Sequence, residues 1–203
     1  MDYNIISTGS KGNCVIINKN IMVDCGVAFR SIKKYLYDVK YLLLTHTHSD
    51  HINRKTIQLI AEEFPKIIII GNHEVHQVWN CSFIANAGFD IVTEDYTFTP
   101  FEALHDVLCY GFVFEVDGQR VIYCTDTGTM ENAPKGVYDF FFIESNHDEQ
   151  KLEQVRNQYK GTYNPYLSGK RHLSTQQAKG FYFMNRRSPD SVFIELHMSE
   201  RFY

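Results

Sequence analysis

The sequence predicts an α/β fold in which two β-sheets are packed between helices, and two observations support this. Many short apolar runs are separated by turn-forming residues, as is typical of strands. Segments with helical spacing of apolar residues fall between groups of these runs. The chain has 203 residues, 44% of them hydrophobic, so we expect one domain with a full core across residues 1–203.

The first half of the chain is expected to be rich in strands. Gly-, Ser- and Asn-containing turns separate its first apolar runs, and later apolar residues recur at helical spacing. The expected elements are strands near residue 5 and at 15–18, 21–24 and 41–44, helices at 27–37 and 52–64, a strand at 67–70 and a helix start at residue 72.

The second half is expected to hold a hairpin and two late buried strands. Asp117-Gly118 lies between two apolar runs, which is a strong hairpin signal. The expected elements are strands at residues 97–104, 111–116, 120–124, 138–143 and 191–196, and a helix at 175–184. Strands and helices mixed in this way favour sheets covered by helices.

Three histidines and an aspartate gather in the run Thr45-His46-Thr47-His48-Ser49-Asp50-His51, directly after a short apolar strand. His46 and His48 lie two residues apart, so they point to the same side while the chain stays extended. Asp50 and His51 follow where a turn can direct them toward a second metal ion about 3.5–4 Å away. A polar strand end that is histidine-rich by chance is the alternative, but three of nine histidines in one run favour a metal site.

Three further candidates, His105, Asp126 and His197, each follow an apolar run that is expected to form a strand. Strand ends on one edge of a sheet can converge in space, and functional side chains often lie there. Taken alone, a histidine at such a place is more often a hydrogen-bonded core or surface residue. Their occurrence together with the histidine run favours one shared site.

Composition limits the classes of function. The net charge of −4 and pI near 6.1 argue against a broad basic surface for long nucleic acid. No apolar stretch approaches the roughly 18–20 residues of a membrane span, and no secretory signal is visible, so we expect no membrane partner. The five cysteines form no CxxC pair, which indicates reduced thiols used as small hydrophobes and a cytoplasmic location.

These motifs resemble the metallo-β-lactamase fold superfamily over nearly the whole chain. The H-x-H-x-D-H signature is complete at residues 46–51, and the order of His105, Asp126 and His197 matches. Other segments resemble the YycJ/WalJ exonuclease branch and parallel motifs of tRNase Z: Gly9-Ser10-Lys11-Gly12-Asn13, Met22-Val23-Asp24-Cys25-Gly26, Glu144-Ser145-Asn146-His147-Asp148, Arg171-His172-Leu173-Ser174 and Leu196-His197-Met198-Ser199-Glu200. The resemblance implies an αββα sandwich of two mixed β-sheets flanked by helices.

The resemblance also implies two divalent metal ions. The implied ligands are His46, His48 and His105 for one ion, Asp50, His51 and His197 for the other, and Asp126 as the bridge. Imidazole and carboxylate suit Zn²⁺, which is the expected ion, as well as Mn²⁺ and Fe²⁺. Asp24 is implied to orient a ligand histidine from behind, with a strand-terminating turn residue as the alternative.

Catalytic groups are implied in the same way. Two metal ions lower the pKa of a shared water, giving a bridging hydroxide that attacks phosphorus. The leaving alkoxide needs a proton, and in related phosphodiesterases a histidine at the position of His172, paired with a glutamate like Glu144, is thought to donate it. Asp50 completes the expected catalytic set. For Glu144 the alternative is the cap of an exposed loop, and His147 has no assigned role.

Substrate contacts are expected from the first loop and from the residue before His172. The expected contacts are Ser10, Lys11 and Asn13 in the loop, and Arg171. Cationic side chains can hold a substrate phosphate, and Arg201 is a further candidate of this kind. A solvated charge is the alternative for each of these cations.

The expected function is metal-dependent phosphodiester hydrolysis by a nuclease, similar to a DNA exonuclease. The chain departs from that branch in its short length, its acidic charge and the sequence after His105. These departures make a small-substrate phosphodiesterase that opens cyclic nucleotides the alternative. A metal-stabilised binding module is a third hypothesis, disfavoured because all seven expected ligands are present. Because relatives commonly dimerise, a homodimer is a further expectation.

Overall fold

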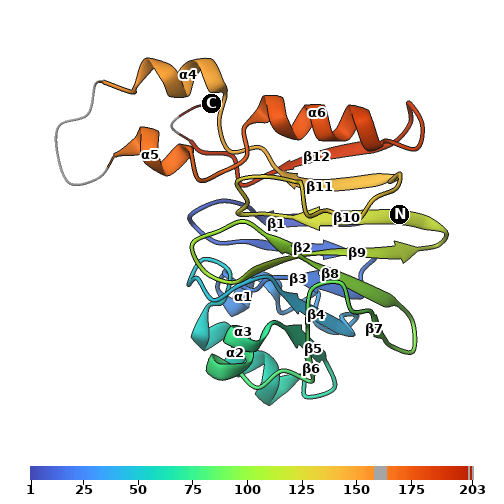
Figure 1. Cartoon of the computed structure of the whole chain (residues 1–203). Coiled ribbons are helices and arrows are strands. Elements are labelled where there is room, and N and C mark those ends of the chain that lie inside the picture. The colour runs from blue at the N-terminus through green and yellow to red at the C-terminus, as the bar shows by residue number, and fades with distance from the viewer. Residues whose placement is uncertain (158–163, 201, 203) are drawn as a thin grey trace.

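A computed structural model describes residues 1–157, 164–200 and 202, which form two six-stranded sheets stacked between helices (Figure 1). Both sheets contain parallel and antiparallel pairs. The expected αββα sandwich of two mixed sheets is therefore confirmed. Within the described ranges, no helix combines the length and apolar character that a membrane span requires.

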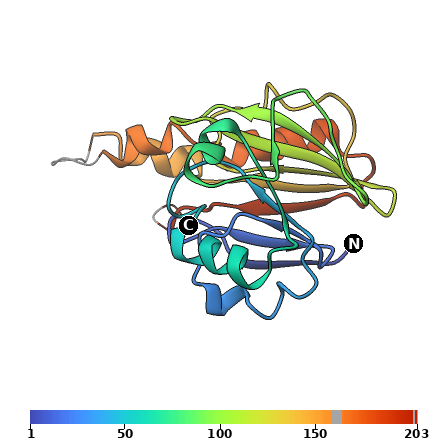
Figure 2. The same cartoon turned by 90° about the horizontal axis from the view of Figure 1, so that it is seen from below.

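The first sheet is antiparallel at one edge and parallel at the other. In sheet order its strands are β1 (Tyr3–Ser7), β2 (Cys14–Ile17), β3 (Ile21–Val23), β4 (Tyr41–Leu44), β5 (Ile68–Gly71) and β6 (Phe83–Ile84). Its outer face packs against α1 (Phe29–Ile32), α2 (Arg54–Glu63) and α3 (His73–Val78). Figure 2 shows α1 (blue) and α2 (teal) side by side on the outer side of this sheet.

The second sheet runs in the order β12-β11-β10-β9-β8-β7. Its strands are β7 (Ile91–Val92), β8 (Thr97–Ala103), β9 (Cys109–Val116), β10 (Gln119–Cys124), β11 (Phe140–Glu144) and β12 (Val192–Leu196). α6 (Thr175–Asn185) covers its outer face, whereas α4 (Glu149–Gln154) and α5 (Pro165–Gly169) lie to one side of the sandwich (Figure 1).

Alternating side chains build the layers. In β4, Tyr41 and Leu43 point into the core between the sheets, and Leu42 and Leu44 point toward the helices. β11 repeats the pattern, with Phe140 and Phe142 between the sheets and Phe141 and Ile143 under α6. Strands buried on both faces read as continuous apolar runs, which is why the sequence revealed them.

The loop and cap signals of the sequence are confirmed. Asp117 and Gly118 have φ values of 51° and 73°, as a two-residue hairpin turn between β9 and β10 requires. Asn72 begins α3, because its side chain accepts a hydrogen bond from the Val75 backbone N–H. The five cysteines are free and buried, as expected of small hydrophobes.

The helix expected at residues 27–37 is wrong in length. Only Phe29–Ile32 is α-helical, and Ala28 provides no side-chain cap. The backbone N–H groups of Tyr35 and Leu36 donate to carbonyls three residues earlier, so tight turns follow the helix. The sequence analysis also missed α4, α5, β6 and β7. Each is six residues or shorter, too short for a periodic pattern.

Candidate metal centre

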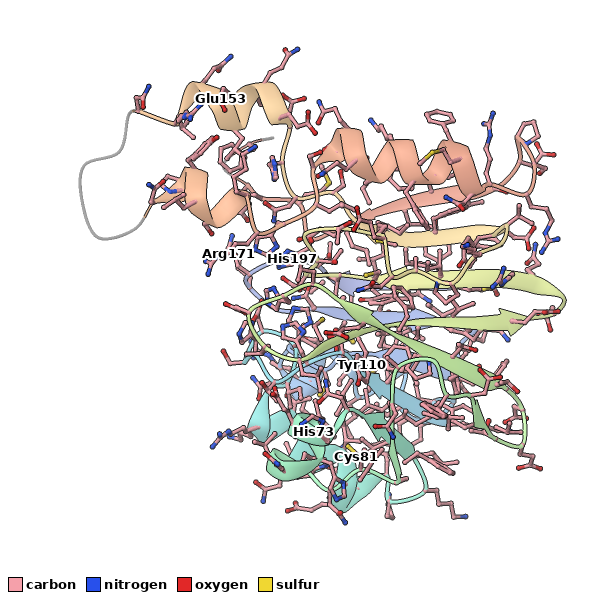
Figure 3. All side chains as sticks on the ribbon, in the orientation of Figure 1. His73, Cys81, Tyr110, Glu153, Arg171 and His197 are labelled. Atoms are coloured by element: carbon pink, nitrogen blue, oxygen red, sulfur yellow. The ribbon has the colours of Figure 1, made fainter. Side chains whose placement is uncertain are left out.

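The predicted ligands gather at one edge of the sandwich, where strands of both sheets end. β10, β11 and β12 are parallel neighbours, so the residues that follow them emerge at the same edge. The backbone N–H of Tyr110 donates to the Thr45 carbonyl, joining β9 to the turn after β4. Figure 3 shows the labelled His197 and Arg171 at this edge, beside α5.

His46, His48 and His105 form the first group. Their nearest ligand atoms all lie within 4.8 Å of one another, and Nδ1 of His48 lies 3.3 Å from Nε2 of His105. Nδ1 of His46 faces the Thr45 hydroxyl at 3.0 Å, whereas its buried Nε2 has no hydrogen-bond partner among the described residues. Burial, and to a smaller extent repulsion from His51, lowers the pKa of His46 well below its usual value. This imidazole is therefore neutral and can bind a cation.

Asp50, His51 and His197 form the second group, again with ligand atoms within 4.8 Å of one another. Nδ1 of His51 lies 2.7 Å from Asp24 Oδ2, and Nδ1 of His197 lies 2.9 Å from Glu144 Oε1. Nε2 of His197 is buried and lacks a partner within the described part of the chain. In both histidines a carboxylate holds Nδ1, which directs Nε2 toward the group.

Asp126 lies between the two groups. Its Oδ2 is 2.8 Å from His51 Nε2, and its carboxylate shares a cluster with His46 and His51. Burial raises the pKa of this carboxyl, but the neighbouring imidazoles of His51 and His197 outweigh burial and hold it well below the usual value. Asp126 is therefore an ionised oxygen donor within reach of both groups.

Three residues of the site adopt left-handed backbone conformations. The φ values are 59° at Asp24, 50° at Asp126 and 52° at His197. A non-glycine residue pays roughly 1–2 kcal/mol for this conformation, and such strain clusters at functional sites. Each residue follows a strand end, so the positive φ turns the side chain into the cluster instead of continuing the strand.

Asp24 supports the turn after β4. Its Oδ1 accepts a hydrogen bond from the Thr45 backbone N–H at 2.9 Å, and Oδ2 faces His51. The side chain is completely buried. Asp24 thus contacts Nδ1 of His51, one of the predicted ligands, and its positive φ lies directly after the end of β3.

Glu144 connects the metal cluster to His172. Its Oε1 lies 2.7 Å from His172 Nδ1 and 2.9 Å from His197 Nδ1, while Oε2 accepts the Thr127 backbone N–H at 2.8 Å. Burial raises the pKa of Glu144, yet hydrogen bonds from both histidines lower it below its usual value. Glu144 is fully buried, which is incompatible with the cap of an exposed loop.

The surroundings of His172 favour its protonated form. Burial lowers its pKa, but the hydrogen bond and charge of Glu144 outweigh this and raise the pKa above the usual value. Because Glu144 holds Nδ1, Nε2 is the nitrogen that can meet a substrate. The ring centroid of His172 lies 5.3 Å from that of His197, so His172 stands directly beside the predicted ligands.

The cluster can hold divalent metal ions. Buried nitrogens of His46 and His197 have no hydrogen-bond partner among the described residues and are available to bind a cation, since buried polar groups are normally satisfied. The seven expected ligands are nitrogen and oxygen donors. Three of their five imidazoles, those of His46, His51 and His197, are held from behind by Thr45, Asp24 and Glu144 respectively. This donor set suits Zn²⁺, Mn²⁺ and Fe²⁺ alike.

Ser10 and Lys11 line a pocket of about 270 Å³ that also touches His172 and His197. Asn13 lies beneath this loop, only 2% exposed, and its amide nitrogen lies 2.8 Å from His51 Nε2. Two of the four expected substrate contacts, Ser10 and Lys11, therefore line the pocket. Asn13 instead contacts His51.

Arg171 and His147 lie outside the pocket lining. Nη1 of Arg171 lies 3.6 Å from Asp106 on the side of His105. His147 is buried against Phe202, and its Nδ1 has no partner among the described residues. Arg201 lies outside the described residues.

The sequence analysis missed Thr45 and Gly26 as supports of the site. A Cβ on Gly26 would lie 1.6 Å from the Asp50 carbonyl oxygen, so only glycine fits there. The backbone N–H of Asn13 donates to the same carbonyl at 2.6 Å. The signal available in the sequence was the glycine two residues after Asp24, but its partner Asp50 is 24 positions away and cannot be read from spacing.

Fold and site together define a hydrolase of the metallo-β-lactamase fold. The family model described as "Beta-lactamase superfamily domain" matches residues 19–178. The chain therefore belongs to the beta-lactamase superfamily.

Comparison with individual proteins agrees with this membership. The chain is 27% identical to the exodeoxyribonuclease YycJ of Bacillus anthracis over 182 residues, which is 77% of this chain and 67% of that protein. It thus spans about two thirds of that relative. Human tRNase Z, short form, has the same fold, with a TM-score of 0.70 at 15% identity over 99% of this chain and 94% of that one. The metallo-beta-lactamase fold protein YhfI from Bacillus subtilis gives 0.69 at 15% identity, over 98% and 86%.

Proposed function

We propose that the chain is a dinuclear metal-dependent phosphodiesterase of the nuclease type. The observation that supports this is the hydrogen-bonded pair of Glu144 and His172 beside the predicted ligands. Phosphodiester hydrolysis expels an alkoxide that needs a proton, and the raised pKa of His172 suits a general acid near neutral pH. A relative named as an exodeoxyribonuclease and a tRNase Z neighbour in fold support the same substrate class.

The ligands would divide as the resemblance implies, with His46, His48 and His105 at one ion, Asp50, His51 and His197 at the other, and Asp126 between. Bound divalent cations would supply Lewis acidity and a water of lowered pKa. Zn²⁺ is the proposed ion, with Mn²⁺ and Fe²⁺ as the other candidates for this donor set.

The protein's own contribution is to position groups and to move one proton. Glu144 fixes Nδ1 of both His172 and His197, so the proton donor and a metal ligand are oriented by the same carboxylate. His172 then gives the Nε2 proton to the leaving oxygen as the phosphorus–oxygen bond breaks. The carboxylate of Asp50, which is mostly buried, would add a negative charge to the second group of ligands.

Substrate comparison tests this proposal. Protein loaded with Zn²⁺ or Mn²⁺ is incubated with end-labelled DNA, 3′,5′-cyclic nucleotides and bis(p-nitrophenyl) phosphate, and metal content is measured in parallel. We expect hydrolysis of DNA and of the generic diester. Cleavage of the cyclic compounds without cleavage of DNA would refute the nuclease assignment.

Opening of small cyclic nucleotides is the second candidate, and the pocket favours it. Its volume of about 270 Å³ lies near the lower limit of small-molecule sites, about 300 Å³. The acidic net charge of −4 also agrees with a small substrate better than with a long duplex.

A further inference from the structure

The pocket beside the metal centre has walls from three separate segments. These are the loop at residues 8–11, α5, and the segment after β12 at residues 198–200 with Phe202. His172 and His197 belong to the same lining, so the pocket opens onto the metal centre. A volume of about 270 Å³ accommodates one compact group and leaves no space for a second of the same size.

The lining combines hydroxyl groups with apolar surfaces. The hydroxyls come from Thr8, Ser10, Ser168 and Ser199, and the apolar surfaces from Pro165, Met198 and Phe202. A nucleoside presents the same combination, because its sugar and base edges form hydrogen bonds while the faces of its base stack on apolar groups. The pocket therefore suits one nucleoside.

Charge at the pocket argues against a continuing nucleic-acid strand. Lys11 is the one lysine or arginine among the described lining residues, and its Nζ lies 2.5 Å from Glu200 Oε1. Arg171, next to His172 in sequence, faces Asp106 and lies outside the lining. A second phosphate at this rim would meet a lysine that Glu200 already neutralises.

The position of the proton donor tells which part of the substrate enters. His172 lines the pocket and would protonate the leaving oxygen, so the group attached to that oxygen lies on the pocket side. His105, with Asp106 and Arg171 beside it, lies outside the pocket lining.

We propose that this pocket receives a single nucleoside as the leaving group, and that Glu200 excludes a second phosphate by neutralising Lys11. This inference rests on the proposed function. Water loses one proton to solvent and its oxygen bonds to phosphorus, the bond from phosphorus to the nucleoside oxygen breaks, and the Nε2 proton of His172 passes to that oxygen. Suitable substrates are dinucleoside monophosphates, cyclic nucleotides and chain ends without a terminal phosphate.

Calorimetric binding of two nucleotides to the zinc-loaded protein tests the charge argument. Thymidine 5′-monophosphate places one phosphate at the metal centre, and thymidine 3′,5′-bisphosphate brings a second to Lys11. In the unmodified protein we expect the two dissociation constants to agree within about two-fold. In Glu200→Gln, the bisphosphate should bind about three- to five-fold more tightly than the monophosphate, the scale of an exposed ion pair.

A matched control is Glu63→Gln, which removes the carboxylate of the exposed Lys33–Glu63 pair on α2. Its ratio of dissociation constants should equal that of the unmodified protein. The inference is overturned if the unmodified protein already binds the bisphosphate at least three-fold more tightly, or if Glu200→Gln leaves the ratio unchanged.

Hydrolysis of bis(p-nitrophenyl) phosphate separates the two proposals, because this diester contains no nucleoside. If the diester is cleaved but the binding ratios fail, the pocket inference is wrong and the proposed function stands. If the ratios behave as expected but the diester is not cleaved, the proposed function is wrong and the nucleoside pocket stands.

Discussion

The two sheets contribute to the metal centre in different ways. After β4 of the first sheet, His46, His48, Asp50 and His51 lie within six residues of sequence. The second sheet contributes one residue at a time, at the ends of different strands: His105 after β8, Asp126 after β10, Glu144 in β11 and His197 after β12.

The two regions position their side chains differently: a single turn holds the first set, whereas the register of several strands holds the second. The turn after β4 is closed by backbone hydrogen bonds from His51 and Ile52 to the His48 carbonyl. The second set depends on the parallel register of β10, β11 and β12, which pairs Cys124 with Ile143 and Glu144 with Leu196. We therefore expect a substitution in the first set to affect only nearby residues. A substitution in the second set should also affect residues at the ends of other strands.

The largest effect is expected at Asp126, which lies within reach of both groups. Asp126→Ala should lose both metal ions and lower diester hydrolysis at least about 10³-fold, because it removes the shared charge of the centre. His48→Ala should instead retain about one ion per chain, since His48 belongs to one group. Metal content by mass spectrometry checks both. Equal metal content in the two variants would contradict the expected difference between the two sheets.

His172→Ala should keep both metal ions and lower turnover by about 10²–10⁴-fold, the usual range for a general acid. Its nitrogen faces Glu144 and the pocket, and His172 is not among the expected ligands. The measurement pairs metal content with steady-state rates on a dinucleoside monophosphate. Loss of metal in this variant would show that His172 is itself a ligand.

Glu144→Gln and Asp24→Asn make a matched pair, because each carboxylate holds Nδ1 of one ligand histidine. Both should weaken metal affinity about 10–100-fold. At saturating metal, the turnover of Asp24→Asn should recover. The turnover of Glu144→Gln should remain low, because Glu144 also holds His172. Metal titration followed by kinetics distinguishes the two variants. If added metal fully restores the turnover of Glu144→Gln, Glu144 does not act through His172.

The smallest effect is expected on stability at Gly26. Gly26→Ala should cost about 1–3 kcal/mol, because its Cβ would collide with the Asp50 carbonyl. Gly180→Ala in α6 is the control; nothing lies within 4 Å of its Cβ, so it should stabilise by about 0.5–1 kcal/mol. Urea unfolding measures both. The comparison would be wrong if Gly26→Ala were as stable as the parent protein.

Much of the fold was readable from the sequence because buried strands are continuous apolar runs. The runs at β4, β5, β10 and β11 gave correct strands, and the Asp117-Gly118 hairpin was correct as well. The short elements α4, α5, β6 and β7 were missed, because helices of six and five residues and strands of two are too short for a period to repeat. Packing against neighbours, not propensity, holds such short elements.

By itself, the sequence determined the local half of the site. His46, His48, Asp50 and His51 are close in space because they are close in the chain, so their spacing was enough to predict a metal-binding turn. Tertiary structure decided the rest. Glu144 joins His172 and His197 from positions 28 and 53 residues away, and Gly26 fits against Asp50 across 24 residues. Such contacts depend on strand register and backbone shape, which no local pattern encodes.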